Sequence, residues 1–311
     1  KDSVNGIVAI NPLTESRSIL IPIKASLVEG LLSNVATGLK NPLRIAIDKD
    51  DGLWILDENH LAFIDLTSGT PSLAIKAGGG VLTDDELSDA KTLQISYHDN
   101  NRWYGTFQVL PNKNVVFSAG DTHVVLDSGN ATTSFKLRVF NNSENKIETI
   151  YFSGFYTKSS TDYDVSTYFP FGPIAVTFNF EKQAIENFYG RFCSETNGGN
   201  NCTPYLLKFN NTGTVVSEIS LTQTPYLYNN FPLIVQNGVN VFALNGIKSF
   251  LFSYDIENDS WSKIIGYNAR ASSFCNNGTA STSCNVRFTD AFVHKNGTVY
   301  FMDQTRIRVL D

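Results

Sequence analysis

The stretch LRIAIDKDDGLWILD, from Leu43 to Asp57, contains the pattern that decides the fold. An apolar segment leads into the polar turn DKDDG, and a second apolar segment follows directly. Two apolar segments joined by a short turn with Asp-Gly are typical of a β-hairpin, because both residues tolerate the positive φ of tight turns. We therefore expect two antiparallel strands here, with their turn near residue 51.

The same pattern returns four more times along the chain. The stretches are GTFQVLPNKNVVFSAG (105–120), GPIAVTFNFEKQAIENFYG (172–190), FPLIVQNGVNVFALNG (231–246) and TDAFVHKNGTVYFMD (289–303). From the first turn to the last, the turn centres follow one another at intervals of 62, 68, 56 and 59 residues. Such a repeat, in which the hairpin precedes more polar strands, indicates the blades of a β-propeller.

We predict an all-β fold with a single β-propeller domain that spans residues 1–311 and has five blades. A six-bladed ring, with an irregular blade within residues 61–97, is the alternative, and a two-sheet sandwich ranks third because it lacks so long a period. The N-terminal stretch NGIVAINPLTESRSILIPI is expected to form two strands that complete the last blade and hide its unpaired edge. Third strands are visible in HLAFIDLTSG, FLFSYDIENDSW and YLLKFNNTGT, each of which ends in an Asp or Asn turn.

Composition excludes two classes of partner. The net charge is −6, only 17% of residues are charged, and no basic run occurs, which argues against nucleic acid or an anionic membrane surface. No apolar run is long enough to span a membrane, so we expect no membrane-spanning segment. The expected partner is a protein or a glycan, including another copy of the chain.

The cysteines point to an oxidising compartment. Cys193 and Cys202 are nine positions apart, as are Cys275 and Cys284, and both pairs enclose residues rich in Asn, Gly, Ser and Thr. We predict two local disulfides, each worth roughly 2–3 kcal/mol of unfolded-chain entropy. A metal site is the rival interpretation, but zinc ligands are usually closer together and no His lies near.

Asn-X-Ser/Thr sequons agree with this compartment. We predict N-glycosylation sites at seven positions: Asn130, Asn141, Asn201, Asn210, Asn258, Asn277 and Asn296. The chain contains 31 Asn, so chance supplies a similar number, and the sequons support secretion only together with the cysteines. Lys1 in place of Met is expected of a mature secreted protein. These features predict a secreted or cell-surface glycoprotein.

One segment resembles known families. ATGLKNPLRIAIDKDDGLWILDENHLAFIDLTSG, residues 36–69, is similar to blades of the NHL-repeat, SMP-30/gluconolactonase-like and yellow/royal-jelly propellers. The shared features are Gly-Leu-X-X-Pro, an apolar strand, an Asp- and Gly-rich turn before Leu-Trp, and a strand that ends in Asp-Leu. YDIENDSW, residues 254–261, is closer to the end of a kelch-type strand. The resemblance implies a propeller, a fold that hosts hydrolases, sugar binders and scaffolds alike.

Acidic residues are the candidates for metal binding and catalysis. Asp48 and Asp50 match half of a calcium-binding loop, although Asp-Gly is also an ordinary hairpin turn and we favour that interpretation. Resemblance to the lactonases and to five-bladed glycosidases implies a divalent cation or a carboxylate pair at the centre of the ring. Asp57, Asp290 and Asp303, near the ends of predicted inner strands, are the candidates for either. We expect no cofactor, with calcium or another divalent ion as the alternative.

Aromatic residues concentrate in two Pro-punctuated connections, residues 155–173 and 224–232. Loops that mix aromatic and polar groups suit sugar stacking or a protein interface, although aromatic residues also cover blade faces. The predicted binding residues are Tyr163, Tyr168, Phe169, Phe171, Tyr226 and Tyr228.

The sequence therefore predicts a secreted, N-glycosylated propeller that serves as an extracellular binding or assembly module, as in a surface layer, sheath or filament. The alternative is an enzyme, a metal-dependent lactonase-like or glycosidase-like hydrolase that uses the central cavity. His60, His98, His123 and His294 have no metal-like spacing, and no Gly-X-Ser-X-Gly nucleophile motif occurs.

Overall fold

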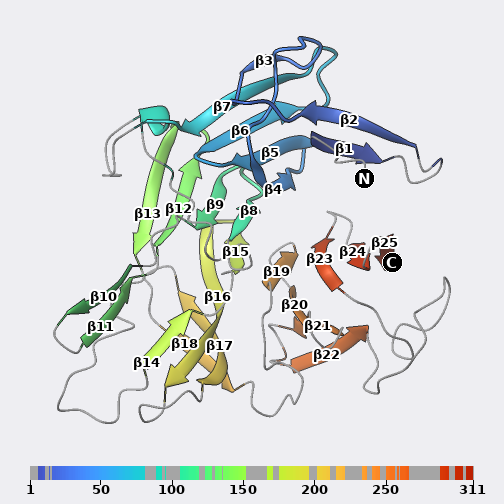
Figure 1. Ribbon diagram of the computed structural model, residues 1–311. Coiled ribbons are helices and arrows are strands. Elements are labelled where there is room, and N and C mark those ends of the chain that lie inside the picture. The colour runs from blue at the N-terminus through green and yellow to red at the C-terminus, as the bar shows by residue number, and fades with distance from the viewer. Residues whose placement is uncertain are drawn as a thin grey trace. The chain divides into compact units, whose positions relative to one another are not determined.

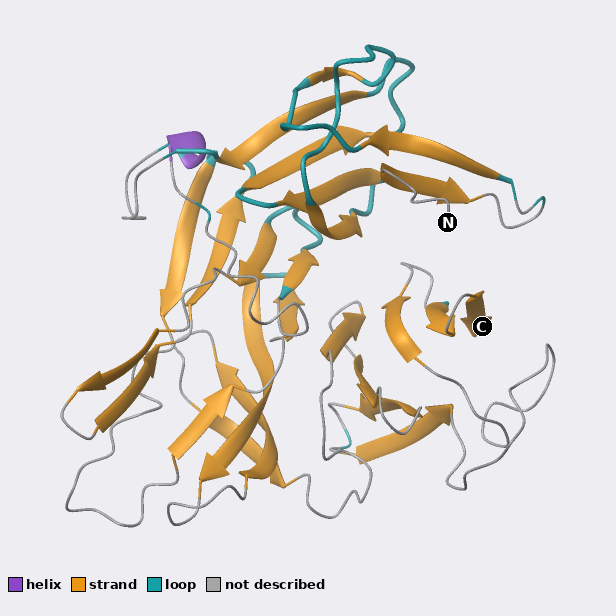
Figure 2. Ribbon diagram, in the orientation of Figure 1, coloured by secondary structure: helices purple, strands orange, loops and turns teal. Residues whose placement is uncertain are grey.

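The computed structural model describes residues 6–10, 14, 16–80, 89–92, 95, 106–118, 123–127, 130–134, 136–151, 167–170, 175–195, 202–210, 215–220, 233–236, 240–245, 250–255, 258, 260–265, 288–293, 298–303 and 306–310. The chain divides into two compact units. The first comprises residues 1–99, 107–121 and 136–150, and the second comprises the remainder. Nearly all elements in the described residues are β-strands, and the 3-10 helix η1 (Ala90–Thr92) is a single turn (Figures 1 and 2).

The first sheet contains the hairpin from which the fold was predicted. Its order is β3-β7-β6-β5-β4, and its strands are β3 (Gly30–Leu31), β4 (Pro42–Ile47), β5 (Gly52–Asp57), β6 (His60–Asp65) and β7 (Ser72–Gly78). Strands β4 to β7 pair antiparallel in chain order, and β3 extends the outer edge.

Strand β5 is buried along its whole length because both faces of the first sheet are covered. Trp54 and Leu56 point to one cluster of buried side chains, while Leu53 and Ile55 point to another. Successive side chains of a strand alternate between the two faces of its sheet, so an uninterrupted apolar run fits this position.

The second sheet has the order β13-β12-β9-β8. Its strands are β8 (Phe107–Val109), β9 (Val115–Ser118), β12 (Lys136–Asn141) and β13 (Lys146–Tyr151). A separate two-stranded hairpin, β10 (His123–Asp127) and β11 (Asn130–Ser134), lies in the chain between β9 and β12. The insertion leaves the meander order of the second sheet intact.

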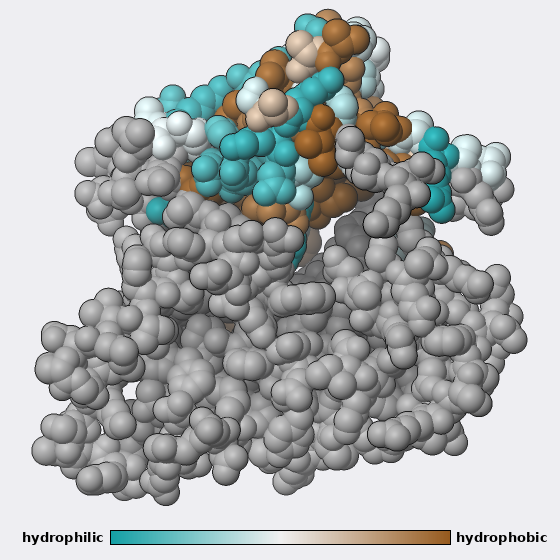
Figure 3. Space-filling view, in the orientation of Figure 1, coloured by the Kyte–Doolittle hydropathy of each residue, from teal (hydrophilic) through white to brown (hydrophobic). Residues whose placement is uncertain are grey.

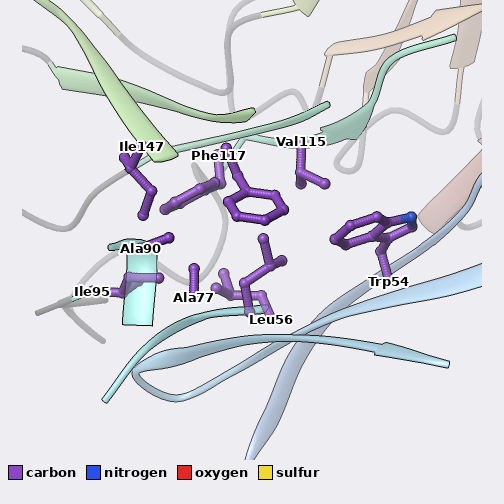
Figure 4. Close-up of a cluster of buried hydrophobic side chains, with 10 residues drawn as sticks. Trp54, Leu56, Ala77, Ala90, Ile95, Val115, Phe117 and Ile147 are labelled. Atoms are coloured by element: carbon purple, nitrogen blue, oxygen red, sulfur yellow. The ribbon is translucent and has the colours of Figure 1, made fainter. Parts of the chain in front are cut away.

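A shared apolar core joins the first and second sheets (Figure 4). Trp54, Leu56 and Ala77 come from the first sheet, and Val115 and Phe117 come from the second. The segment around η1 adds Ala90 and Ile95, so the connection between the sheets helps to fill the core (Figure 4). Trp54 also lies against Phe140, with ring centroids 5.9 Å apart.

The other face of the first sheet is covered by the N-terminal hairpin, β1 (Gly6–Ile10) and β2 (Arg17–Pro22). Ile21 is fully buried there, and Ile7 and Leu20 pack beside it. β1 pairs with β2 in a two-stranded sheet of their own. The expected pairing of these strands with the last blade is therefore not among the strand pairings of the described residues.

The second unit contains three larger sheets. One has the order β14-β16-β17-β18, with β15 also paired to β16; the others are β19-β20-β21-β22 and β23-β24-β25. The bounds are β14 (Thr167–Pro170), β15 (Ala175–Asn179), β16 (Ala184–Glu195), β17 (Cys202–Asn210), β18 (Val215–Ser220), β19 (Leu233–Gln236), β20 (Asn240–Asn245), β21 (Phe250–Asp255), β22 (Ser260–Ile265), β23 (Phe288–Val293), β24 (Val299–Asp303) and β25 (Arg306–Leu310).

First strands of successive sheets contact one another within each unit. β4 contacts β8 in the first unit; in the second, β19 contacts β23 and also β15, the first strand of the hairpin β15–β16. Antiparallel meanders whose first strands lie side by side are typical of propeller blades. The all-β propeller prediction is confirmed, and each of the five predicted hairpins is present. The number of blades and the single-domain organisation stay predictions.

Candidate functional site

The turn between β4 and β5 is organised by the buried carboxylate of Asp48, which is 4% exposed. Asp48 Oδ1 accepts hydrogen bonds from the backbone N–H groups of Asp50 (2.9 Å) and Gly52 (2.8 Å). Asp48 Oδ2 accepts one from the indole N–H of Trp54 at 3.1 Å. The carboxylate is thus fully engaged with its own hairpin, which is the role of a turn residue.

Backbone geometry explains why this turn needs Gly52. Asp51 has a φ of 63°, and the Asp48 N–H closes the turn on the Gly52 carbonyl at 2.9 Å. A Cβ on Gly52 would lie 2.5 Å from the Phe63 ring and 2.6 Å from Asp48 Oδ2. Any larger residue would therefore displace the groups that hold the turn.

The turn between β8 and β9 repeats this backbone geometry 62 residues later. The Leu110 N–H bonds the Asn114 carbonyl at 2.8 Å, and the Lys113 N–H bonds the Leu110 carbonyl at 2.8 Å. Lys113 has a φ of 66°, close to that of Asp51. Here the side-chain cap is Asn112, whose Oδ1 accepts a bond from the Asn114 N–H at 3.1 Å.

An ion pair connects the two turns. Lys113 Nζ lies 2.8 Å from Asp50 Oδ2. The hydrogen bond to Asp50 raises the pKa of Lys113, and the charges of Asp48 and Asp65 act in the same direction. Asp50 is more than half exposed, so the pair adds little stability, but it occupies the side chain that the calcium hypothesis required. Among the described residues, no group of three or more His, Cys, Asp or Glu side chains could hold a metal ion.

Asp57, a candidate for catalysis, is fully buried at the end of β5. Its Oδ2 accepts a hydrogen bond from the Lys40 N–H at 2.9 Å, and its Oδ1 accepts one from the Asn41 N–H at 2.5 Å. Lys40 Nζ also pairs with Glu58 at 2.7 Å, and this hydrogen bond raises the pKa of Lys40. Both oxygens of Asp57 therefore fix the segment that leads into β4.

The other two catalytic candidates lie in the second unit. Asp290 on β23 is opposite Met302, and Asp303 on β24 is opposite Phe288. The three aspartates are divided between the two units, and the side chains of Asp290 and Asp303 lie outside the described part of the structure. Their prediction as a catalytic or metal-binding set stays a prediction.

The first cysteine pair falls on two neighbouring strands. Cys193 on β16 is opposite Pro204, and Cys202 on β17 is opposite Glu195, so the cysteines are two register positions apart in one hairpin. Cys275 and Cys284 lie outside the described residues. Both disulfides stay predictions.

Four of the seven sequons are in the described residues. Asn130 begins β11, Asn141 ends β12, Asn210 ends β17, and Asn258 is exposed between β21 and β22. Asn201, Asn277 and Asn296 lie outside the described residues. Of the predicted aromatic binding residues, Tyr168 and Phe169 lie on β14, and the other four are also outside; the binding role stays a prediction.

The ends of the third strands form a pattern that the sequence analysis recognised only in part. β6, β12, β17 and β21 end at Asp65, Asn141, Asn210 and Asp255 respectively. All of these strand ends except Asn141 are expected from the sequence as Asp or Asn turns that end third strands. The available signal was the Asp/Asn-X-Ser/Thr pattern, which residues 65–67 and 141–143 share.

Hydrogen bonds show that the first two of these turns are built alike. Asp65 Oδ1 accepts bonds from the N–H (2.9 Å) and the hydroxyl (2.7 Å) of Thr67. Asn141 Oδ1 accepts bonds from the N–H (3.2 Å) and the hydroxyl (2.8 Å) of Ser143, and from the Glu144 N–H at 3.3 Å. The bonds from Thr67 lower the pKa of Asp65.

Apolar side chains reach the surface of the first unit (Figure 3). On the hairpin β1–β2, Ile10 is 44% exposed and Ile19 is 58% exposed. Val8 is opposite Ile19 in the register, and Ile10 is opposite Arg17. Alternation along the strands places Val8, Ile10, Ile19 and the exposed Arg17 on one face, which is called the outer face of the hairpin. No helix of the described residues is long and apolar enough to cross a membrane.

Comparison with solved structures finds distant likenesses. Virginiamycin B lyase from Staphylococcus aureus is 10% identical over 92% of this chain and 74% of its own, with a TM-score of 0.36. A Bacteroides caccae protein of unknown function is 11% identical over 97% of this chain and 80% of its own, with a TM-score of 0.46. An auxiliary nutrient binding protein from Bacteroides ovatus is 12% identical over 92% of this chain and 58% of its own, with a TM-score of 0.48. At these values the likenesses carry no argument about activity or ligand.

No protein-family model and no curated protein matches the chain. The resemblance of residues 36–69 to NHL-type and SMP-30-like blades therefore stays a prediction. That segment folds as three antiparallel strands, β4 to β6, with Asp48 and Gly52 in the first turn.

Proposed function

We propose that the protein is a secreted, N-glycosylated propeller that acts as an extracellular binding or assembly module. The observation that carries the proposal is the outer face of the hairpin, where Ile10 and Ile19 are exposed beside Val8. The opposite face of the same hairpin is packed on the first sheet through Ile7 and Ile21. Neighbouring apolar side chains that are exposed on one sheet face mark a site of protein interaction, and Arg17 on the same face adds a charge to it.

The partner is a protein, including another copy of this chain. A low charged fraction of 17% favours close packing of subunits, and the paired cysteines and sequons support an extracellular location. The alternative function, a hydrolase, has less support. Both oxygens of Asp57 accept hydrogen bonds from backbone N–H groups, and both oxygens of Asp48 accept hydrogen bonds within the turn, so these carboxylates already have structural roles.

Light scattering behind size exclusion, on the natively secreted protein with and without enzymatic deglycosylation, tests the proposal. We expect species larger than the 34.4 kDa chain plus its removable glycan. The substitution Ile19→Lys is expected to reduce their size, because a charge on the outer face resists burial. Ser18→Lys is the matched control, since Ser18 is a neighbouring exposed polar position on the same strand.

Two results would contradict the proposal. If the protein stays monomeric and binds no partner at high concentration, the assembly function is excluded. If Ile19→Lys and Ser18→Lys have equal effects, the outer face has no role in assembly. For the enzymatic alternative, a chelator-sensitive melting temperature together with loss of hydrolysis on Asp290→Asn or Asp303→Asn would favour the hydrolase.

A further inference from the structure

The turns that follow the third strands of the first and second sheets differ in one chemically important atom. Asp65 and Asn141 occupy the same position, and each accepts the N–H and the hydroxyl of the residue two places later. The second side-chain atom is a carboxylate oxygen in Asp65 and an amide nitrogen in Asn141. The turn therefore needs one side-chain oxygen and leaves the other atom available.

At Asn141 the available atom is the one that an N-linked glycan takes. Among the described residues, all hydrogen bonds of the Asn141 side chain use Oδ1, and the amide nitrogen Nδ2 has no partner there. Ser143, which completes the sequon, is exposed, and so are Glu144, Asn145 and Lys146. The turn thus presents a sequon on the surface with its oxygen fixed and its nitrogen free.

We propose that the turn after the third strand is the position at which the blades carry glycans, with Asn141 as the modified residue of the second sheet. In the transfer, Asn141 Nδ2 forms a bond to the anomeric carbon of an oligosaccharide. The bond from that carbon to the phosphate of a polyprenyl-phosphate-linked donor breaks, the lipid phosphate leaves, and the amide loses one proton. This inference rests on the proposed secretion, because the donor and its transferase belong to the secretory route.

The position recurs along the chain. Asn210 ends β17, the third strand of its sheet, and begins the sequon Asn210-Asn211-Thr212. Asn258 begins a sequon in the connection between β21 and β22, three residues after Asp255 ends the third strand, so the connection recurs there but the strand-end position does not. Asp65 is the one of these turns in which a single-atom change would complete a sequon, since Thr67 is already in place.

Glycopeptide mapping of the full chain, secreted from a host that N-glycosylates, tests the proposal. We expect glycan on the Asn141 peptide of the parent and its loss in both Asn141→Asp and Ser143→Ala. Asn141→Asp should keep the parental melting temperature, because Asp65 shows that Asp makes the same bonds. Asp65→Asn should add one glycan mass, and the double variant Asp65→Asn with Thr67→Ala should not.

The outcomes separate this inference from the proposed function. An unmodified Asn141 in protein that carries glycan at other sequons overturns the inference and leaves secretion intact. A folded Asp65→Asn variant without added mass overturns the equivalence of the two turns. Secreted protein with no glycan at any sequon overturns both the inference and the proposed glycosylation.

Discussion

The first and second sheets make the same hairpin turn with different side chains. Residues 48–52 and 110–114 share their closing backbone hydrogen bonds and a positive φ at the fourth residue. In the first sheet the cap is the buried carboxylate of Asp48, which reaches three donors, whereas in the second Asn112 reaches one. Leu110, at the position of Asp48, is buried and apolar. The backbone repeats because its hydrogen bonds need no particular side chain, and the polar network belongs to the first sheet alone.

The largest effect is expected from the residue that connects the Asp48 network to the core between the two sheets. Trp54→Ala removes a side chain that is 1% exposed, packs on Phe63 and Phe140, and donates to Asp48. We expect a loss of about 3–5 kcal/mol, measured by urea unfolding. Ile45→Ala, at a 53% exposed position of the same sheet, is the control and should cost less than about 1 kcal/mol. Similar losses for both variants would contradict the burial of Trp54.

The comparison of caps predicts unequal costs for removing them. Asp48→Ala leaves two backbone N–H groups and the Trp54 indole without their acceptor, so we expect a loss of roughly 2–4 kcal/mol. Asn112→Ala removes one bond at a partly buried site, and about 1 kcal/mol is expected. Chemical denaturation of the two variants measures both losses in the free energy of unfolding. Equal losses would show that the Asp48 network contributes no more than a single cap.

The ion pair between the two turns should have a smaller effect. Lys113→Met removes the partner of Asp50, which is 56% exposed, and we expect a change below about 1 kcal/mol that shrinks further as salt is added. Thermal unfolding at low and high ionic strength measures it. A loss that persists at high salt would mean that packing of the Lys113 stem, rather than charge, joins the turns.

The smallest effect separates the two turns after the third strands by their response to pH. The pKa of Asp65 is lowered on folding, so its contribution is fully present above the unfolded value of about 4 and is lost as pH falls through the folded value. Asn141 does not titrate. In unglycosylated protein, the stability difference between the parent and Asp65→Asn should be constant above about pH 5 and decrease in more acidic buffer. A stability difference between the parent and Asp65→Asn that does not change with pH would show that the Asp65 hydrogen bonds do not lower its pKa in the folded protein.

Sequence alone predicted the elements that depend on short-range pattern. The hairpin around residue 51 and its four repeats were predictable because paired apolar segments and turn chemistry act within about 15 residues. The Asp48 interpretation as a turn residue followed from Asp-Gly in the same way. The Lys113–Asp50 pair was not predictable, since it depends on how two blades pack.

The candidate catalytic aspartate shows a second limit. Asp57 was predicted as a candidate because it lies at the end of an inner strand, but that position does not predict which groups donate hydrogen bonds to its carboxylate. The segment at Lys40 and Asn41, 17 and 16 residues earlier respectively, supplies both donors. Likewise, the exposure of Val8, Ile10 and Ile19 could not be predicted from these residues, because they are as apolar as Ile7 and Ile21 on the buried face of the hairpin.

The hairpin β10–β11 has a practical consequence for engineering this protein. It is spliced into the chain between the second and third strands of the second sheet, whose order β8-β9-β12-β13 is the same as in an uninterrupted meander. The order of the second sheet is therefore compatible with an inserted segment at that connection, and an epitope or a fluorescent reporter is best added within this hairpin, whose last register pair is Asp127 and Asn130. A label spliced there would leave the paired strands of every blade covalently unchanged.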